Sequence, residues 1–416
     1  MSDLRWFFVD MNSYFARCEQ QLNPRLRGRP VGVLPMMGVA TTCCLAASPE
    51  AKTHGVKTGT SVADARRLCP GITFLPARPK AYVEFHHKIV EAVESILPVE
   101  DVLSIDEMAC RLMGSQQQPE RATALAHGVK AAIRAKAGDY LSCSVGIAPN
   151  RLLAKMGSDM QKPDGLVLIP RSQIRDKLLT LVPRDIPGIG PRMEQRLALK
   201  GVRSMEQLLR CNIHQMRVLW GGVVGERFYH WLRGDDVYVA PTRTTSMGHQ
   251  HVLEPVLRTS EGASIVAMKL LTKAAARLRR EGYYARRLTV HVRFMEERNG
   301  QGGGPSSWEG ALKIPETQDT MTLLKNLVVL WSGVPQGRPL RVGVVFSDLI
   351  PADQHQFSLF EDPKREMLSR ALDGINDRFG GGTLRFAGQE AAEDSAPTRI
   401  PFTRVPGLRE FEGESV

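Results

Sequence analysis

The chain has 416 residues and a formal net charge of +11, from 55 Lys and Arg against 44 Asp and Glu. That length allows about two to four domains with a sizeable core, and the basic excess favours a polyanionic partner over a merely soluble surface. No apolar run approaches the roughly 20 residues that cross a bilayer, which argues against a membrane-spanning protein.

The seven cysteines are scattered and lack the paired spacing of a zinc site, so we assign them no role. The N-terminus leads straight into a strand-like run, with neither a basic n-region nor a signal-type cleavage site. We therefore expect a cytoplasmic protein that makes no membrane contact.

The first part of the chain alternates between strand and helix patterns and lacks a dinucleotide-binding glycine fingerprint. Strands are expected at 6–11, 31–34, 72–75 and 141–147, and helices at 12–20, 61–68, 82–97, 121–137 and 151–160. This alternation predicts a sheet domain with helices on one face.

Two strand-like runs carry carboxylates. Asp10 closes the run 6–11, and Asp106 and Glu107 follow the largely apolar residues 102–105. If these runs are neighbouring strands, three carboxylates converge in one apolar sheet, where oxygen ligands suit a hard cation such as Mg²⁺. Two such ions about 4 Å apart serve in-line displacement at phosphorus. Alternatively, Asp10 is only a turn residue and one of the pair points to water, because strand residues alternate faces.

Two lysines are candidates for phosphate contacts near such a site. Lys52 lies in a connector rich in small residues, and Lys162 follows the helix 151–160. Each could equally be an ordinary surface lysine.

Residues 171–236 have an all-helical character, and within them the run 186–191 matches a helix-hairpin-helix. Gly188 and Gly190 tighten such a hairpin, so that backbone N–H groups at a helix N-terminus can hold a DNA phosphate. Residues 237–245 then form an expected linker.

An α+β block follows, with an expected helix at 262–280, strands at 288–294 and 340–346, and a glycine-rich loop at 299–307. Arginines gather there, including Arg286 and Arg287, and alternation places His291 and Arg293 on an open face of the sheet. A sheet with one basic open face suits contact with a duplex backbone.

Taken together, the motifs resemble those of Y-family, translesion DNA polymerases, of the bacterial DNA polymerase IV or DNA polymerase V catalytic-subunit type. The resemblance rests on 8–12, 104–107, 144–150, 159–165 and 187–190, in the order and spacing of the family. It implies an α+β right hand with a palm (1–10 and 76–168), small fingers (11–75), a helical thumb (169–236) and a little finger (246–350). Residues 351–388 would hold a clamp-binding motif and a C-terminal helix, and 389–416 a disordered tail.

The resemblance also implies roles for individual residues. Asp10, Asp106 and Glu107 would hold two Mg²⁺ ions, with the backbone carbonyl of Met11 as a further ligand. Phe15 would be the steric gate that excludes a ribose 2′-hydroxyl.

Lys52 and Lys162 would contact the triphosphate of an incoming deoxynucleotide, on a primer–template DNA substrate. The family often carries Tyr and Arg where this chain has Pro49 and Lys52, and Lys is a less bidentate phosphate partner than Arg.

Residues 356–360 resemble a sliding-clamp-binding peptide, in which Gln356 meets a polar notch while Leu359 and Phe360 fill an apolar pocket of a beta-type clamp. Accessory subunits of the SOS response to DNA damage are further expected partners. Two other functions stay open at this point: a non-catalytic scaffold that links the clamp to repair proteins, and a different two-metal palm enzyme such as a nucleotide cyclase.

Overall fold

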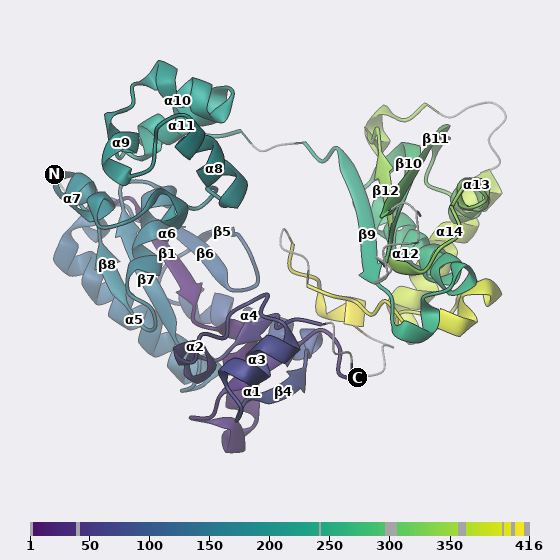
Figure 1. Cartoon of the computed structure of the whole chain (residues 1–416), viewed down its shortest axis with the longest axis horizontal. Coiled ribbons are helices and arrows are strands. Elements are labelled where there is room, and N and C mark those ends of the chain that lie inside the picture. The colour runs from purple at the N-terminus through teal and green to yellow at the C-terminus, as the bar shows by residue number, and fades with distance from the viewer. Residues whose placement is uncertain are drawn as a thin grey trace. The chain divides into compact units, whose positions relative to one another are not determined.

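The computed structural model describes residues 3–38, 42–240, 243–295, 306–356, 363–392, 395–400 and 404–411. The chain divides into two compact units, one of Met1–Val239 with Ile400–Pro406 and one of Ala240–Arg399 with Gly407–Val416 (Figure 1). The division after Val239 falls inside the expected linker. No helix in the described part of the chain is long and apolar enough to span a membrane.

The first unit is built on a five-stranded sheet in the order β5-β6-β1-β7-β8. Its strands are β1 (Trp6–Met11), β5 (Val99–Val102), β6 (Glu107–Arg111), β7 (Cys143–Ala148) and β8 (Leu166–Leu168). The central strand β1 is antiparallel to both β6 and β7, and all six of its residues are buried. The first and second acidic runs are therefore neighbours.

Helices cover both faces of this sheet, so the expectation of helices on one face is wrong. The helices that pack around it are α4 (Pro79–Glu94), α5 (Pro119–Ala137) and α6 (Arg151–Met160). Trp6 and Phe8 pack with Leu153 of α6, whereas Phe7 and Val9, which point the other way, are also fully buried. Gly146 lets α6 lie close to the sheet, because a Cβ there would sit 1.9 Å from the carbonyl oxygen of Ala154.

A small three-stranded sheet with short helices follows β1 in the chain. Its elements are α1 (Tyr14–Leu22), β2 (Val31–Leu34), β3 (Ala46–Ala47), α2 (Pro49–Thr53), α3 (Val62–Leu68) and β4 (Thr73–Pro76). Ala51, Val56 and Ala65 belong to a separate core beneath it.

The remainder of the first unit is helical, as expected. Its helices are α7 (Ile174–Leu179), α8 (Pro191–Leu199), α9 (Met205–Arg210), α10 (Ile213–Trp220) and α11 (Val223–Trp231). Leu197 and Phe228 share one hydrophobic core with Trp6 and Phe8 of β1, so this helical part packs directly on the large sheet.

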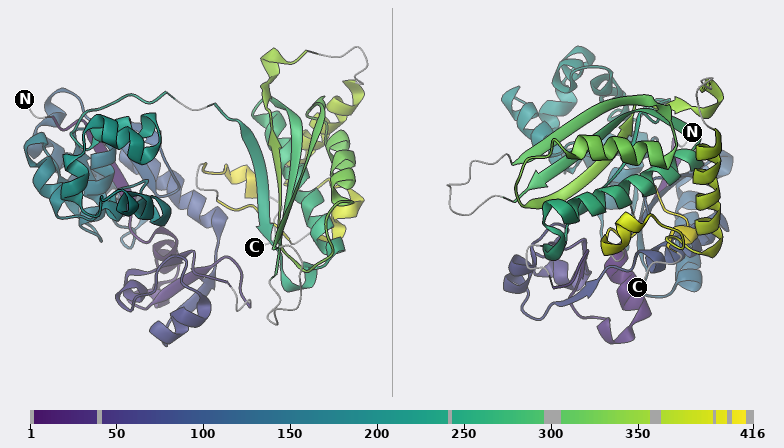
Figure 2. Two further views of the ribbon diagram at one scale, coloured as in Figure 1. Left: turned by 45° about the horizontal axis from the view of Figure 1, so that its top comes forward. Right: turned by 90° about the vertical axis from the view of Figure 1, so that its right-hand side faces the viewer.

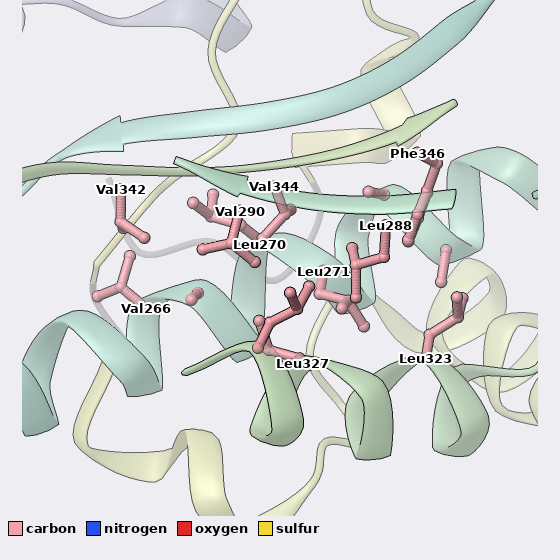
Figure 3. Close-up of a cluster of buried hydrophobic side chains, with 14 of the residues drawn as sticks. Val266, Leu270, Leu271, Leu288, Val290, Leu323, Leu327, Val342, Val344 and Phe346 are labelled. Carbon is pink, nitrogen blue, oxygen red and sulfur yellow. The ribbon is translucent and has the colours of Figure 1, made fainter. Parts of the chain in front are cut away.

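The second unit is a sheet in the order β11-β10-β12-β9, with helices packed on one face (Figure 2). Its elements are β9 (Ser246–Val252), α12 (Ser260–Arg280), β10 (Tyr283–Phe294), β11 (Ser307–Thr317), α13 (Thr320–Trp331), β12 (Pro339–Ser347) and β13 (Ile350–Pro351). Figure 3 shows the core between the sheet and the helices, where Leu270 and Leu327 meet Val290 and Val344. The sequence had not indicated β9, β11 or α13.

The helix α14 (Pro363–Phe379) packs on the second unit through polar contacts. Arg279 of α12 donates to both carboxylate oxygens of Asp373, at 2.6 and 2.8 Å, and Ser369 donates to Asp319 at 3.0 Å. The expectation of a disordered tail from 389 onward is wrong for the described part of that segment. For example, the side-chain amide of Gln389 donates to the Thr272 hydroxyl at 2.6 Å.

Candidate active site

Asp10 and Glu107 are cross-strand partners in the antiparallel pair of β1 and β6. Asp106 lies in the turn immediately before β6, and its backbone carbonyl accepts a 2.9 Å hydrogen bond from the N–H of Met11. The three carboxyl-bearing residues thus meet at one end of the central strand pair. Asp10 is only 3% exposed, so its carboxylate depends on partners within the protein.

The turn that carries Asp106 is held from two sides. The Ser104 hydroxyl donates to the Asp106 carboxylate at 2.7 Å. His86, buried on α4, contacts the carbonyl oxygen of Ile105 through Nδ1 at 2.8 Å. This histidine therefore holds the backbone of the turn that carries Asp106.

Two lysines of the α6 region enter the carboxylate cluster. Lys155 forms ion pairs with Asp10, with Glu107 at 2.8 Å and with Asp159 at 3.4 Å. Lys162, which was expected to contact a triphosphate, pairs with Asp10 at 2.6 Å and with Asp159 at 2.9 Å. Asp10 therefore lies between two ammonium groups.

The ionisation of the acids reflects their burial. Burial raises the pKa of Asp106, and the neighbouring Asp10 charge adds to the rise, while the Ser104 hydrogen bond opposes it. Burial also raises the pKa of Glu107, against the opposing effect of Lys155. Burial by itself lowers the pKa of Lys155, but the Asp10, Asp159 and Glu107 carboxylates raise it above its usual range. The protein alone therefore stabilises the ionised forms of Asp106 and Glu107 less well than water does.

The donor set suits a hard divalent cation, because it consists of carboxylate oxygens and two of the three acids have raised pKa values. Within the described residues, however, no three His, Cys, Asp or Glu side chains stand arranged as a ready-made metal site. In this structure the ammonium group of Lys155 pairs with both Asp10 and Glu107 and so occupies the space between these two carboxylates.

Asn12 connects the end of β1 to the segment that carries Lys162. Its amide nitrogen donates to the Ser144 hydroxyl at 3.0 Å, and its amide oxygen accepts from the N–H of Asp164 at 2.8 Å. Lys130, also buried, donates to the carbonyl oxygens of Asp164 and Gly165 at 2.6 and 2.9 Å. These bonds fix the position of Lys162 relative to Asp10.

Phe15 of α1 is half-buried, and its ring stacks on Tyr82 of α4 with the centroids 4.5 Å apart and 12° between the planes. Tyr82 is fully buried and donates its hydroxyl to Glu19 at 2.8 Å. Glu19 also accepts from Arg78. Phe15 therefore rests on a rigid support.

Lys52, on α2, approaches the same cluster from the small-sheet part of the unit. Its pKa is lowered, first by partial loss of hydration and next by the charge of Lys162, while Asp10 and Asp106 oppose the change. The charges of Lys162, Asp10 and Asp106 therefore act on Lys52, and its contact with a triphosphate stays a prediction.

The expected DNA-contacting glycines precede α8. Gly188 has φ +95° and lies against Phe228, which explains why this position needs glycine, and Gly190 is the N-cap of α8. Both glycines are exposed.

On the sheet of the second unit, Arg287, His291 and Arg293 alternate with the buried Leu288, Val290 and Val292 and so share the open face. Arg287 pairs with Asp348 and Arg286 with Glu316, both at 3.1 Å. Arg293 lies opposite Arg341 on β12, an arrangement that favours a bound anion because like charges in that register repel.

In the expected clamp motif, Gln356 is exposed, while Leu359 and Phe360 lie outside the described residues. Sequence reasoning did not identify Lys155, the support of Phe15 by Tyr82, or the role of Asn12 between two segments. The only signal for Lys155 was its spacing of four residues from Asp159, which places both on one face of a helix.

Comparisons with known proteins agree with this geometry. Residues 9–159 match the sequence model of the impB/mucB/samB family, and residues 244–359 match the C-terminal domain of that family. Residues 184–236 match the thumb domain of DNA polymerase-iota.

Two similar relatives are both named DNA polymerase IV. The one from Moorella thermoacetica is 33% identical over 389 residues, covering 91% of this chain and 94% of the relative. The one from Pelotomaculum thermopropionicum is 31% identical over 416 residues, covering 98% of each.

Among solved structures, a Y-family DNA polymerase chimera of Dbh and Dpo4 is similar with a TM-score of 0.66 at 25% identity, covering 84% of this chain and all (100%) of that one. An insertion ternary complex of Dbh DNA polymerase is similar with a TM-score of 0.55, also at 25% identity and with the same coverage, 84% and 100%.

Proposed function

Because the chain belongs to the Y family of DNA polymerases, and is a DNA-directed DNA polymerase of the translesion type, we propose that Asp10, Asp106 and Glu107 are its catalytic carboxylates. One observation carries the proposal. Asp10 and Glu107 are paired across β1 and β6, next to Asp106, at the point where Lys155 and Lys162 meet them. Three acids, of which Asp10 is buried, and two lysines converge there.

Members of this family in general depend on divalent metal ions, and we propose Mg²⁺, two ions per site, held by the three carboxylates and the backbone carbonyl of Met11. Ions bound there would supply Lewis-acid chemistry, which would favour ionisation of the primer 3′-hydroxyl and offset the charge of the pyrophosphate. The protein's own part is to keep Asp10 buried beside Lys155 and Lys162 and to hold Asp106 by its bond from Ser104. This arrangement positions charge before the substrate arrives.

Lys162 and Lys52 are the proposed contacts for the triphosphate of the incoming deoxynucleotide. Lys162 contacts Asp10 at 2.6 Å, so an arriving anion meets it beside the catalytic acids. Lys52 interacts electrostatically with Lys162, and a polyphosphate between them would relieve their repulsion. Phe15, backed by Tyr82, is the proposed steric gate under the sugar.

Primer–template DNA is proposed to contact both units through its backbone. Exposed Gly188 and Gly190 before α8 offer N–H groups to a phosphate. Arg287 and Arg293 on the open face of β10, with Arg286 at its edge, add positive charge without reading sequence.

A beta-type sliding clamp remains a proposed partner, through Gln356, Leu359 and Phe360, and accessory SOS subunits are proposed as further partners. We propose that the enzyme acts in the cytoplasm and is of the DNA polymerase IV type, which is the name of its relatives. The scaffold alternative is not favoured, because all three acids are present, and the relatives rule against a nucleotide cyclase.

The proposal is tested by primer extension on damaged and undamaged templates with Asp106→Ala and with Asp101→Ala. Asp101 is an exposed acid on β5 that pairs with Arg151 at 2.6 Å, and it serves as the matched control. We expect Asp106→Ala to lose extension by at least about 10³-fold while still binding DNA, and Asp101→Ala to remain active. Wild-type extension by Asp106→Ala in Mg²⁺ would overturn the assignment.

A further inference from the structure

Lys155 has a set of contacts that no expected role explains. Its ammonium group has three N–H donors and three carboxylate partners: Asp10, Glu107 at 2.8 Å and Asp159 at 3.4 Å. Its side chain is 17% exposed. The ammonium group also lies 5.3 Å from the centre of the Phe8 ring, within the range of a cation–π contact.

The position of this charge matters because of what lies on either side. Asp10 and Glu107 face each other across an antiparallel strand pair, where two negative charges repel. With Asp10 almost fully buried, water cannot relieve that repulsion. A cation between the two acids offsets that repulsion when no divalent ion is bound.

The third partner, Asp159, lies one helical turn beyond Lys155 on α6. It gives the ammonium group a carboxylate that is no part of the proposed metal site. A lysine that lost Asp10 and Glu107 to an arriving ion would therefore keep an ion pair without leaving the protein.

From these contacts we infer that Lys155 is the resident counter-ion of the site in the absence of metal: it holds Asp10 and Glu107 together and retreats to Asp159 when a divalent ion binds. This inference rests on the proposed function, since it takes Asp10 and Glu107 as metal ligands. It makes Lys155 a positioning residue whose effect is largest before DNA and nucleotide bind.

The experiment uses the full chain without DNA or nucleotide and measures Mn²⁺ affinity by titration, together with the thermal midpoint with and without Mn²⁺. Lys155→Met removes the competing charge, so we expect Mn²⁺ to bind at least about fivefold more tightly. The same variant removes the ammonium partner of buried Asp10 and half-buried Glu107, so its metal-free thermal midpoint should fall by about 3 °C or more. Saturating Mn²⁺ should close that gap.

Lys136→Met is the control, because Lys136 on α5 is a lysine paired with a carboxylate, Glu91 of α4 at 2.6 Å, that has no part in the proposed site. Its loss should lower the midpoint equally with and without Mn²⁺ and leave the Mn²⁺ affinity unchanged. Lys155→Arg keeps the positive charge on a side chain with more hydrogen-bond donors, so this variant should bind Mn²⁺ no more tightly than the wild type. It tests the inference even if Lys155→Met does not fold.

The variant Asp10→Asn distinguishes an error in the proposed metal site from an error in the proposed role of Lys155. If Asp10→Asn binds Mn²⁺ as tightly as the wild type, the proposed metal site is wrong. If Asp10→Asn weakens binding but Lys155→Met changes neither the affinity nor the metal dependence of the midpoint, the site stands and the counter-ion role of Lys155 is overturned.

Discussion

Replacing Phe15 by Ala should relax the enzyme's choice of sugar. The ring stacks on Tyr82 at 4.5 Å, and Tyr82 is itself fully buried and bonded to Glu19, so the ring cannot yield to an extra hydroxyl. A 2′-hydroxyl pressed against it loses water without gaining a partner, which costs about 1–3 kcal/mol, or roughly 5- to 150-fold in rate. Removing the ring removes that penalty.

The assay is single-nucleotide primer extension with a deoxynucleotide and the matching ribonucleotide. The ratio of the two kcat/KM values is the informative quantity, because it does not depend on how much of the protein is active. We expect this ratio to fall by about 10- to 100-fold in Phe15→Ala and by less in Phe15→Leu, which keeps most of the bulk. A ratio within twofold of wild type in Phe15→Ala would refute the gate.

Three further predictions concern single charges. Lys162→Ala should raise KM for deoxynucleotides by about 10- to 100-fold with little effect on DNA affinity, measured by steady-state kinetics and anisotropy; an unchanged KM would remove Lys162 from the triphosphate site. Lys52→Arg, which supplies a bidentate phosphate partner, should lower the same KM by about 2- to 10-fold, and a higher KM would contradict the assignment. Asp319 caps α13, because its carboxylate accepts a 2.8 Å hydrogen bond from the N–H of Thr322. Burial acts to raise the pKa of Asp319, but this bond and the one from Ser369 lower it overall. Its stabilising effect is therefore present above the unfolded pKa of about 3.9 and lost as pH falls through the lower folded value. Chemical denaturation should show Asp319→Ala about 1 kcal/mol less stable than the wild type at pH 6, with the difference shrinking toward pH 3; a difference that widens on acidification would contradict this sign.

The fold class and the meeting of Asp10 with Asp106 and Glu107 could be predicted because their signals are local. Asp10 and the Asp106–Glu107 pair each follow a run of apolar strand residues, and no knowledge of distant contacts is needed to see them. That Asp10 faces Glu107 is a matter of register, which the structure supplies. The resemblance to a polymerase family relates these local signals to one site, and the similarity to a relative named DNA polymerase IV confirms the family.

Lys155 could not be predicted because its role depends on which face of the sheet α6 covers and how closely. That approach is set by Gly146, where a side chain would strike the α6 backbone. Nothing local to Lys155 distinguishes it from a surface lysine on an amphipathic helix.

The strands β9 and β11 escaped prediction for a different reason. Each lies at an edge of the second sheet and carries many exposed or polar residues, so alternation of apolar residues is weak. The described part of the C-terminal segment, expected as disordered, is held by lysines of α12, such as Lys273 with the carbonyl oxygen of Ala396 at 2.9 Å. Such tertiary contacts have no signature in the segment's own composition.

The most direct measurement of the central claim is a crystal structure of the enzyme with primer–template DNA, a non-reactive deoxynucleotide analogue and Mn²⁺, with the ions located by anomalous scattering. We expect two peaks, each in contact with carboxylate oxygens from Asp10, Asp106 or Glu107, and both in contact with the nucleotide phosphates or the primer terminus. Ions bound elsewhere, with Asp10 still paired to lysine in the assembled complex, would contradict the proposed metal site.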